Sequence, residues 1–230
     1  HKLKKYDSKR PKLIVFESVY SMDGDFGDVQ GIVDLAKKYG AMTFCDEVHG
    51  VGLYGKNGGG YCQEVGLDGE IDIIQGTFAK AYGTVGGFIT GKAEIIDAIR
   101  LNSTGFIFST SLPPMIAAAT MENIKYLAVS DKERVLMKEM VAYLKSSLSE
   151  VGIEAVPNQS HIVSIKIGDA RKAEGMSNRL LNEFGVYIQH INYPTVAKGD
   201  ERLRIIVTPF HSKKLIDDLV RGLQKVIENS

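Results

Sequence analysis

A lysine set among small residues is the most chemically suggestive feature of this sequence. Lys80 lies in the run Thr77-Phe78-Ala79-Lys80-Ala81-Tyr82-Gly83, directly after an apolar stretch. Most lysines are solvated surface charges, but small neighbours leave space around this amine. Upstream, the run Asp46-Glu47-Val48-His49 also follows an apolar stretch. An amine to hold an aldehyde, a carboxylate for a ring nitrogen and hydroxyls for a phosphate are what pyridoxal phosphate chemistry needs.

Each of these residues has a hypothetical role in such a site. Asp46 would pair with the protonated pyridine nitrogen, and His49 would hydrogen-bond the phenolic oxygen of the cofactor. Thr77 would offer its hydroxyl to the phosphate. The ordinary alternatives are that Asp46 is a helix cap or a solvated loop charge and that Lys80 is a surface lysine. The combination favours the cofactor site over these alternatives.

The elements that must position these residues follow from the hydrophobic pattern. The pattern predicts strands at 13–18, 41–45, 71–74 and 87–90, and helices at 28–39 and 93–100. Strands that alternate with helices indicate an α/β fold with a mostly parallel, doubly wound sheet. Ser21, Asp46 and Thr77 each follow the end of a predicted strand. We therefore expect these three residues at one edge of the sheet, where such folds bind ligands.

The pattern changes in the second half of the chain. A long helix is predicted to begin at Pro113-Pro114, and a second one spans 131–151. Strands at 162–167, 186–191 and 203–207 and helices at 170–183 and 212–227 then indicate a smaller α+β unit. We place the boundary near Leu127, so that 1–127 is part of a large domain and 128–230 is a small C-terminal domain.

Composition excludes several classes of partner. Lys+Arg and Asp+Glu both number 28, so no net charge attracts nucleic acid or an anionic membrane. The longest apolar runs have the length of a strand, far short of the roughly 20 residues of a membrane helix. Cys45 and Cys62 lack Cys-x-x-Cys spacing, and we expect Cys45 to be a buried, reduced thiol of an intracellular protein.

Other motifs give weaker evidence of function. Gly50-Val51-Gly52-Leu53-Tyr54-Gly55 matches the dinucleotide fingerprint, but further glycines follow where that motif needs a helix, so we predict a loop. The five histidines show no metal-ligand spacing, and no Gly-x-Ser-x-Gly elbow is present. The run Ser109-Thr110-Ser111 is either a helix cap or a phosphate cradle. Either arginine of Arg202-Leu203-Arg204 could bind a substrate carboxylate, and the pattern leaves open which one.

With these residues in view, the chain resembles the α-oxoamine synthases, which are fold-type I pyridoxal-phosphate-dependent acyltransferases. It is most similar to the branch that forms 5-aminolevulinate, through its INYPTV run and the arginines that follow. The matching runs are FESVYSMDGD (16–25), DEVHGVG (46–52), DIIQGTFAKAYG (72–83), FIFSTSLPP (106–114), INYPTV (191–196) and ERLRI (201–205).

The resemblance implies roles in cofactor binding. Lys80 would be the Schiff-base lysine and the base that removes the glycine α-proton, with Asp46 and His49 in the roles given above. Ser21 and Thr77 would lie at the ring and phosphate end of the cofactor. Ser109 or Thr110 would reach the phosphate of a neighbouring subunit, so that a homodimer shares its active sites.

The resemblance also implies substrates. Arg204 would bind the glycine carboxylate and Thr195 would approach the succinyl carboxylate. Glycine and succinyl-CoA would condense to 5-aminolevulinate, CoA and CO2, which is the first committed step of one haem and porphyrin route. The alternatives are 2-amino-3-ketobutyrate CoA ligase, 8-amino-7-oxononanoate synthase or a non-catalytic α/β module. Asn57 stands where an arginine is common in the family.

The resemblance further implies that the chain is the catalytic and C-terminal portion of such an enzyme. The family's N-terminal part would be missing, and this portion alone would be incomplete as a catalyst. We expect the bacterial cytoplasm as its location, with the mitochondrial matrix as the alternative.

Overall fold

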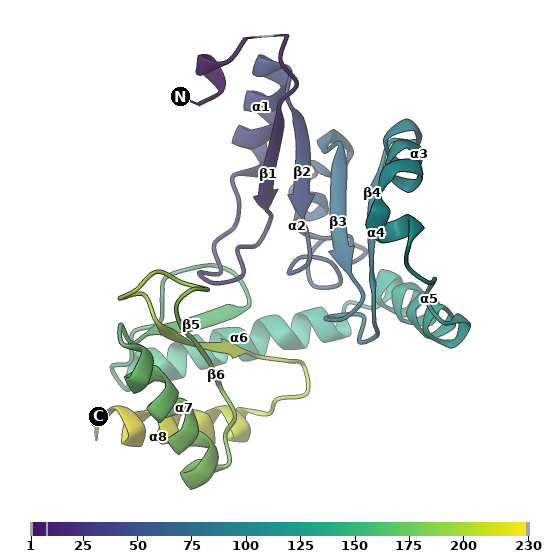
Figure 1. The fold of residues 1–230 in the computed structure, drawn as a ribbon. Coiled ribbons are helices and arrows are strands. Elements are labelled where there is room, and N and C mark those ends of the chain that lie inside the picture. The colour runs from purple at the N-terminus through teal and green to yellow at the C-terminus, as the bar shows by residue number, and fades with distance from the viewer. Residues whose placement is uncertain (1, 8, 229–230) are drawn as a thin grey trace. The chain divides into compact units, whose positions relative to one another are not determined.

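The computed structural model describes residues 2–7 and 9–228, which form two compact units (Figure 1). The first unit comprises the residues up to Val19 together with Phe26–Asp131. The second comprises Tyr20–Asp25 together with the residues from Lys132 onward. The division therefore falls after Asp131, and a short segment from the first half of the chain groups with the second unit.

The first unit is built on a four-stranded sheet in the order β1-β2-β3-β4. Its strands are β1 (Leu13–Glu17), β2 (Met42–Asp46), β3 (Ile73–Thr77) and β4 (Gly87–Gly91). The first three are parallel and β4 is antiparallel to β3, so the prediction of a mostly parallel sheet is confirmed. The helices are η1 (Leu3–Lys5), α1 (Val29–Tyr39), α2 (Tyr61–Glu64), η2 (Asp68–Glu70), α3 (Ala93–Asn102), α4 (Thr104–Ile107) and α5 (Pro114–Val129).

Helix α1 begins and ends where its sequence predicts. The Asp28 carboxylate caps the helix by accepting a hydrogen bond from the Gly31 backbone N–H at 3.0 Å. Gly40 ends it in the left-handed conformation, with φ 57°. The apolar side of α1 packs on one face of the sheet, in a core formed by Phe16, Val29, Val33, Cys45, Cys62, Ile71 and Ile74.

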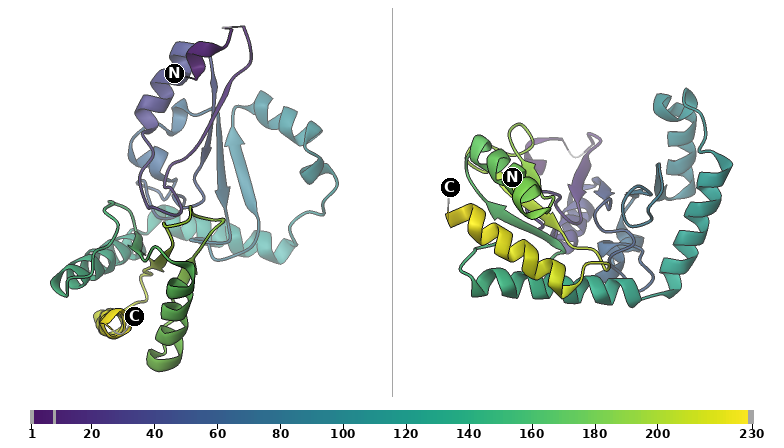
Figure 2. Two further views of the ribbon diagram at one scale, coloured as in Figure 1. Left: turned by 60° about the vertical axis from the view of Figure 1, so that its left-hand side comes forward. Right: turned by 90° about the horizontal axis from the view of Figure 1, so that it is seen from below.

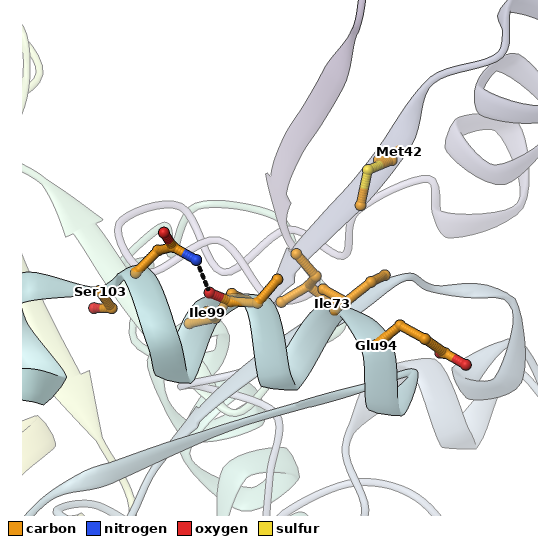
Figure 3. A pocket seen from close by; sticks show the side chains of 8 residues that line it. Met42, Ile73, Glu94, Ile99 and Ser103 are labelled. Atoms are coloured by element: carbon orange, nitrogen blue, oxygen red, sulfur yellow. Dashed lines mark hydrogen bonds between the residues drawn. The ribbon is translucent and has the colours of Figure 1, made fainter.

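The opposite face of the sheet is covered by α3 only in part. Ile95 and Ile99 of α3, with Met42 and Ile73 of the sheet, line a groove of about 640 Å³ (Figure 3). Farther along this face, Leu13 and Val15 of β1 remain exposed. Helices thus lie on both faces of the sheet, but apolar side chains of the second face stay open to solvent.

The second unit has a three-stranded antiparallel sheet in the order β5-β7-β6. Its elements are α6 (Lys132–Glu150), β5 (Ile162–Lys166), α7 (Ala170–Phe184), β6 (Gln189–Ile191), β7 (Arg202–Ile206) and α8 (Lys213–Glu228). Helix α8 packs against both α6 and α7, and it buries Ile216, Leu223 and Val226 (Figure 2).

The strand predicted at 186–191 is wrong for its first half. Gly185 ends α7 in the left-handed conformation, with φ 66°. The Val186 N–H then donates to the Leu180 carbonyl at 3.0 Å, which completes the helix cap. Because this backbone is committed to the cap, the strand begins only at Gln189.

A side-chain clamp holds the start of β3 against β2. The buried Thr43 donates from its backbone N–H and its hydroxyl to the Asp72 carboxylate, at 2.9 and 3.1 Å. In return, the Asp72 N–H donates to the Thr43 hydroxyl at 2.9 Å. The clamp fixes how β3 is aligned with β2, and thereby where the far ends of the two strands lie.

We predict that Thr43→Val destabilises the protein by about 1–3 kcal/mol, because the Asp72 N–H loses its partner inside the fold. Equilibrium unfolding in urea measures this change. Thr90→Val is the matched control, since Thr90 is exposed on β4 and should change stability by less than about 0.5 kcal/mol. Equal stabilities of the two variants would contradict the clamp.

Candidate functional site

The edge of the sheet brings the lysine and the acid–histidine pair together. Asp46 ends β2 and Thr77 ends the neighbouring parallel strand β3, with Asp46 opposite Gln75. The turn after β2 carries His49, and the bend after β3 carries Lys80. The Lys80 Nζ lies 2.8 Å from the His49 Nε2. Residues 31 positions apart thus meet through their functional atoms.

The contact between Lys80 and His49 has a direct chemical meaning. Ammonium and doubly protonated imidazole carry only donors, so a hydrogen bond between Nζ and Nε2 requires one of the two atoms to lack a proton. The pair therefore holds one transferable proton between an amine and an imidazole. A lysine arranged in this way can act as a nucleophile or as a base.

Asp46 and Thr77 shape the turns that carry this pair. The Asp46 Oδ1 accepts from the Val48 N–H at 2.8 Å, which tightens the turn before His49. The Thr77 hydroxyl accepts from the Ala79 N–H at 3.1 Å and donates to the Gly86 carbonyl at 3.1 Å. Asp46 and Thr77 are both half-buried. In the structure, Asp46 and Thr77 thus bind backbone groups of the segments that carry His49 and Lys80.

Sequence reasoning assigned no role to Glu47, which the structure makes central. Its side chain is fully buried and accepts from the Ser18 hydroxyl at 2.5 Å. It also accepts from the backbone N–H groups of Tyr61 and Cys62, at 3.0 and 2.6 Å. Each of these donors is neutral, so the carboxylate is stabilised by hydrogen bonds. Its place between Asp46 and His49 was the signal available in the sequence.

The glycine loop leaves room for this carboxylate. A Cβ on Gly60 would approach the Glu47 carboxyl carbon at 2.7 Å, and Gly60 itself has φ 115°. A Cβ on Gly50 would lie only 1.8 Å from the Glu47 Oε2. Through the described residues 50–60 the chain is loop, and the first helix after it, α2, begins at Tyr61. The dinucleotide fingerprint therefore lacks the helix it needs, and the prediction of a loop is confirmed.

The second unit contains Ser21 and Arg204 in contact. The Arg204 Nη1 donates to the Ser21 carbonyl oxygen at 3.0 Å. Among the residues that the structure describes, the buried Arg204 Nε has no hydrogen-bond partner. Burial also lowers the pKa of Arg204 below its ordinary value. Arg202, by contrast, is bound to Asp23 through an ion pair. The two arginines, which the residue pattern did not distinguish, thus differ in their bonding partners.

Three further candidates lie in irregular backbone. Thr195 is exposed in the segment between β6 and β7, and its N–H donates to the Asn192 carbonyl at 3.0 Å. Ser109 and Thr110 are exposed between α4 and α5. Helix α5 begins behind Pro113 with no side-chain cap from the described residues, so the cap alternative is wrong. The binding roles of these three residues stay predictions.

Two other features are not candidate active sites. Cys45 and Cys62 are both buried and reduced, with sulfur atoms 3.5 Å apart, and their mutual contact and burial raise the pKa of the Cys62 thiol. The groove beneath α3 offers Glu94 as its only titratable side chain among the described residues (Figure 3). Within the part of the chain that the structure describes, no helix is long and apolar enough to cross a membrane.

Comparison with known proteins shows which family the chain matches. A sequence model of the aminotransferase class I and II family matches residues 1–223. The 5-aminolevulinate synthase of Rickettsia typhi is 56% identical over 96% of this chain and 53% of its own length. That of Rhizobium meliloti is 50% identical over 98% of this chain and 56% of its own. The chain spans about half the length of the curated relatives it matches.

A solved structure agrees with the fold. Serine palmitoyltransferase from S. paucimobilis, bound to a pyridoxal phosphate adduct, superposes with a TM-score of 0.93 at 32% identity. The match covers 99% of this chain and 57% of that one.

We predict that Glu47→Gln lowers the free energy of unfolding by about 1–3 kcal/mol, because an amide NH2 would face a backbone N–H and leave it unpaired. Thermal unfolding measures the change. The control is Glu64→Gln, since the exposed Glu64 carboxylate also accepts from a glycine-loop N–H, that of Gly55 at 2.7 Å. If the two variants unfold at the same temperature, Glu47 does not hold the turn.

Proposed function

Because the chain belongs to the aminotransferase class I and II family, we propose that it provides the lysine-bearing part of a 5-aminolevulinate synthase. The observation that carries the proposal is the contact between Lys80 and His49 beside Asp46 at the sheet edge. The names and identities of the relatives favour this activity over those of other family members. The complete enzyme would condense glycine with succinyl-CoA and release CoA and CO2.

The residues present fit pyridoxal phosphate, the cofactor of this family. The donor set combines an amine, an imidazole and a carboxylate on two adjacent strand ends, and Thr77 adds a hydroxyl. Lys80 would hold the aldehyde carbon, Asp46 the ring nitrogen and His49 the phenolic oxygen. When bound, the cofactor supplies an electron sink for the carbanion that forms on the amino acid.

The protein's own groups would manage the proton of that reaction. Lys80 is the group that takes the α-proton of glycine, since a neutral amine is a competent base. His49, 2.8 Å from the Lys80 Nζ, is positioned to accept a proton from the lysine or return one to it. Asp46, as an anion, would keep its ring partner protonated.

Arg204 is the proposed anchor for the glycine carboxylate. Its Nε is buried and lacks a partner among the described residues, and burial disfavours its charge. A carboxylate bound by this guanidinium would satisfy the N–H and offset the cost of burying the positive charge. The surroundings of Arg204 therefore fit a small anionic group. Thr195 is the proposed contact for the succinyl carboxylate.

A second copy of the chain is the proposed partner. From the end of α3 through α5 the first unit exposes several large apolar side chains, including Leu101, Phe106, Phe108, Met115 and Val129. Exposed apolar surface of this extent is typical of an interface. In a homodimer, Ser109 or Thr110 would reach the phosphate bound by the partner subunit. We place the enzyme in the bacterial cytoplasm, since both relatives named above come from bacteria.

We predict that the full-length polypeptide, mixed with pyridoxal phosphate, shows a visible absorbance band that Lys80→Ala abolishes, because the variant lacks the amine that bonds covalently to the cofactor aldehyde. Lys92→Ala is the control, since Lys92 is exposed between β4 and α3 and should leave the band unchanged. A band that persists in Lys80→Ala would remove the cofactor role of this lysine.

We predict that the wild-type enzyme uses succinyl-CoA in preference to acetyl-CoA or a pimeloyl thioester. Arg204→Ala should raise the KM for glycine roughly 10- to 100-fold, since charged hydrogen bonds contribute about 1.5–3 kcal/mol. The KM for succinyl-CoA should change little. Steady-state kinetics with release of CoA as readout measures both effects. Preference for acetyl-CoA would reject this activity in favour of a 2-amino-3-ketobutyrate CoA ligase.

A further inference from the structure

Strand β7 presents two arginines on one face of the second sheet. Arg202 and Arg204 are alternate residues of the strand, so their side chains point to the same side. Lys166 and Ser164 of β5 lie opposite them in register. Two neighbouring guanidinium groups on one face would repel each other, and both would attract a carboxylate.

The two arginines nevertheless have different surroundings. The Arg202 Nη1 donates to the Asp23 carboxylate at 2.5 Å and to the Met22 carbonyl at 3.1 Å, while its Nε donates to the Asp200 carbonyl at 2.9 Å. Its side chain is only 7% exposed. Arg204, in contrast, keeps an Nε without a partner among the described residues. Asp23 thus neutralises one arginine and leaves the other available.

Side chains bind three consecutive backbone carbonyls in the segment that carries Asp23. The carbonyl of Ser21 accepts from Arg204, and that of Met22 accepts from Arg202 and from the Ser164 hydroxyl at 3.1 Å. The carbonyl of Asp23 accepts from the Asn158 Nδ2 at 2.9 Å. Three consecutive carbonyls are therefore bound by side chains of the second unit, which explains why this segment groups with it.

The ion pair is suited to fixing geometry. The pair joins a buried guanidinium to a carboxylate that stays partly in water, since the Arg202 side chain is only 7% exposed and the Asp23 side chain is 52% exposed. Removing Asp23 would leave the Arg202 charge buried without its carboxylate partner. Without Asp23, Arg202 would be a second cation beside Arg204. Without Arg202, the Met22 carbonyl and the Asp23 carboxylate would lose their shared donor.

Building on the proposed function, we propose that Asp23 and Arg202 are a positioning pair for the amino acid substrate. The pair holds residues 21–23 on the arginine face of the sheet. It thereby supports Arg204 through the Ser21 carbonyl and leaves Arg204, and not Arg202, open to the substrate carboxylate. Neither Asp23 nor Arg202 touches the substrate in this role.

The test uses the full-length enzyme loaded with cofactor and compares Arg202→Met with Lys166→Met. Lys166→Met breaks the exposed ion pair between Lys166 and Asp200, which lies in the same sheet opposite Arg202. Arg202→Met should raise the dissociation constant for glycine, read from the cofactor absorbance, by about 10-fold or more. Lys166→Met should change it less than about twofold.

Two further measurements separate positioning from general destabilisation. Arg202→Met should leave the KM for the acyl-CoA within about twofold of wild type, and it should speed amide hydrogen exchange in residues 20–25. Arg202→Lys should restore part of the glycine affinity, because lysine keeps a charged donor for Asp23 but loses the planar fork.

The outcomes test the positioning role of Asp23 and Arg202 separately from the proposed function. Equal glycine affinities of Arg202→Met and Lys166→Met would overturn the positioning role, as would a parallel loss of affinity for both substrates. A wild-type enzyme that binds cofactor and an amino acid other than glycine would instead reject the proposed function. The same variants, titrated with that amino acid, would then decide the role of the pair.

Discussion

The buried carboxylate of Glu47 is the interaction on which the candidate site depends. A charge inside a protein is tolerated only when hydrogen bonds replace its water shell. Here the replacements are the Ser18 hydroxyl and two backbone N–H groups at the start of α2. Because the chain on either side of Glu47 carries Asp46 and His49, this requirement fixes the turn between them. The glycines at positions 50 and 60 follow from the same requirement, since larger residues would displace the carboxylate.

The second unit applies the same principle with a charge of the opposite sign. Arg202 is buried, and its guanidinium is satisfied by Asp23 and by the carbonyls of Met22 and Asp200. A segment without regular secondary structure must still pair its backbone carbonyls, and here side chains provide the donors. In each unit, one buried charged side chain with several hydrogen bonds therefore holds an irregular segment: Glu47 in the first unit and Arg202 in the second.

Structural and reactive groups differ in how fully they are satisfied. Glu47 and Arg202 have several strong partners each, which makes them poor candidates for chemistry. Arg204 has a buried N–H left over within the described chain, and Lys80 and His49 share a contact that holds one transferable proton. Binding a carboxylate needs a donor that is left over, and moving a proton needs two groups in contact.

The sequence alone determined which segments of the first unit are strands and which candidate residues lie near their ends, although β3 extends to Thr77, beyond the predicted 71–74. Apolar runs mark buried strands, and the ends of parallel strands meet at one edge, so Asp46, His49 and Lys80 could be assigned to one site. Local chemistry also sufficed for α1, whose cap and stop lie within the helix sequence. At 186–188 the strand was predicted too long, because the hydrophobic pattern does not reveal that the backbone at Val186 completes the cap of α7.

Only the tertiary structure decided which charged residues are structural and which are available for binding. The partners of Glu47 lie directly after β1 and at the start of α2, and Arg202 contacts Asp23 at a separation of 179 residues. No local pattern encodes such a pairing, because it depends on how distant segments pack. For this reason the local residue pattern does not distinguish Arg202 from Arg204, although their environments differ in the fold.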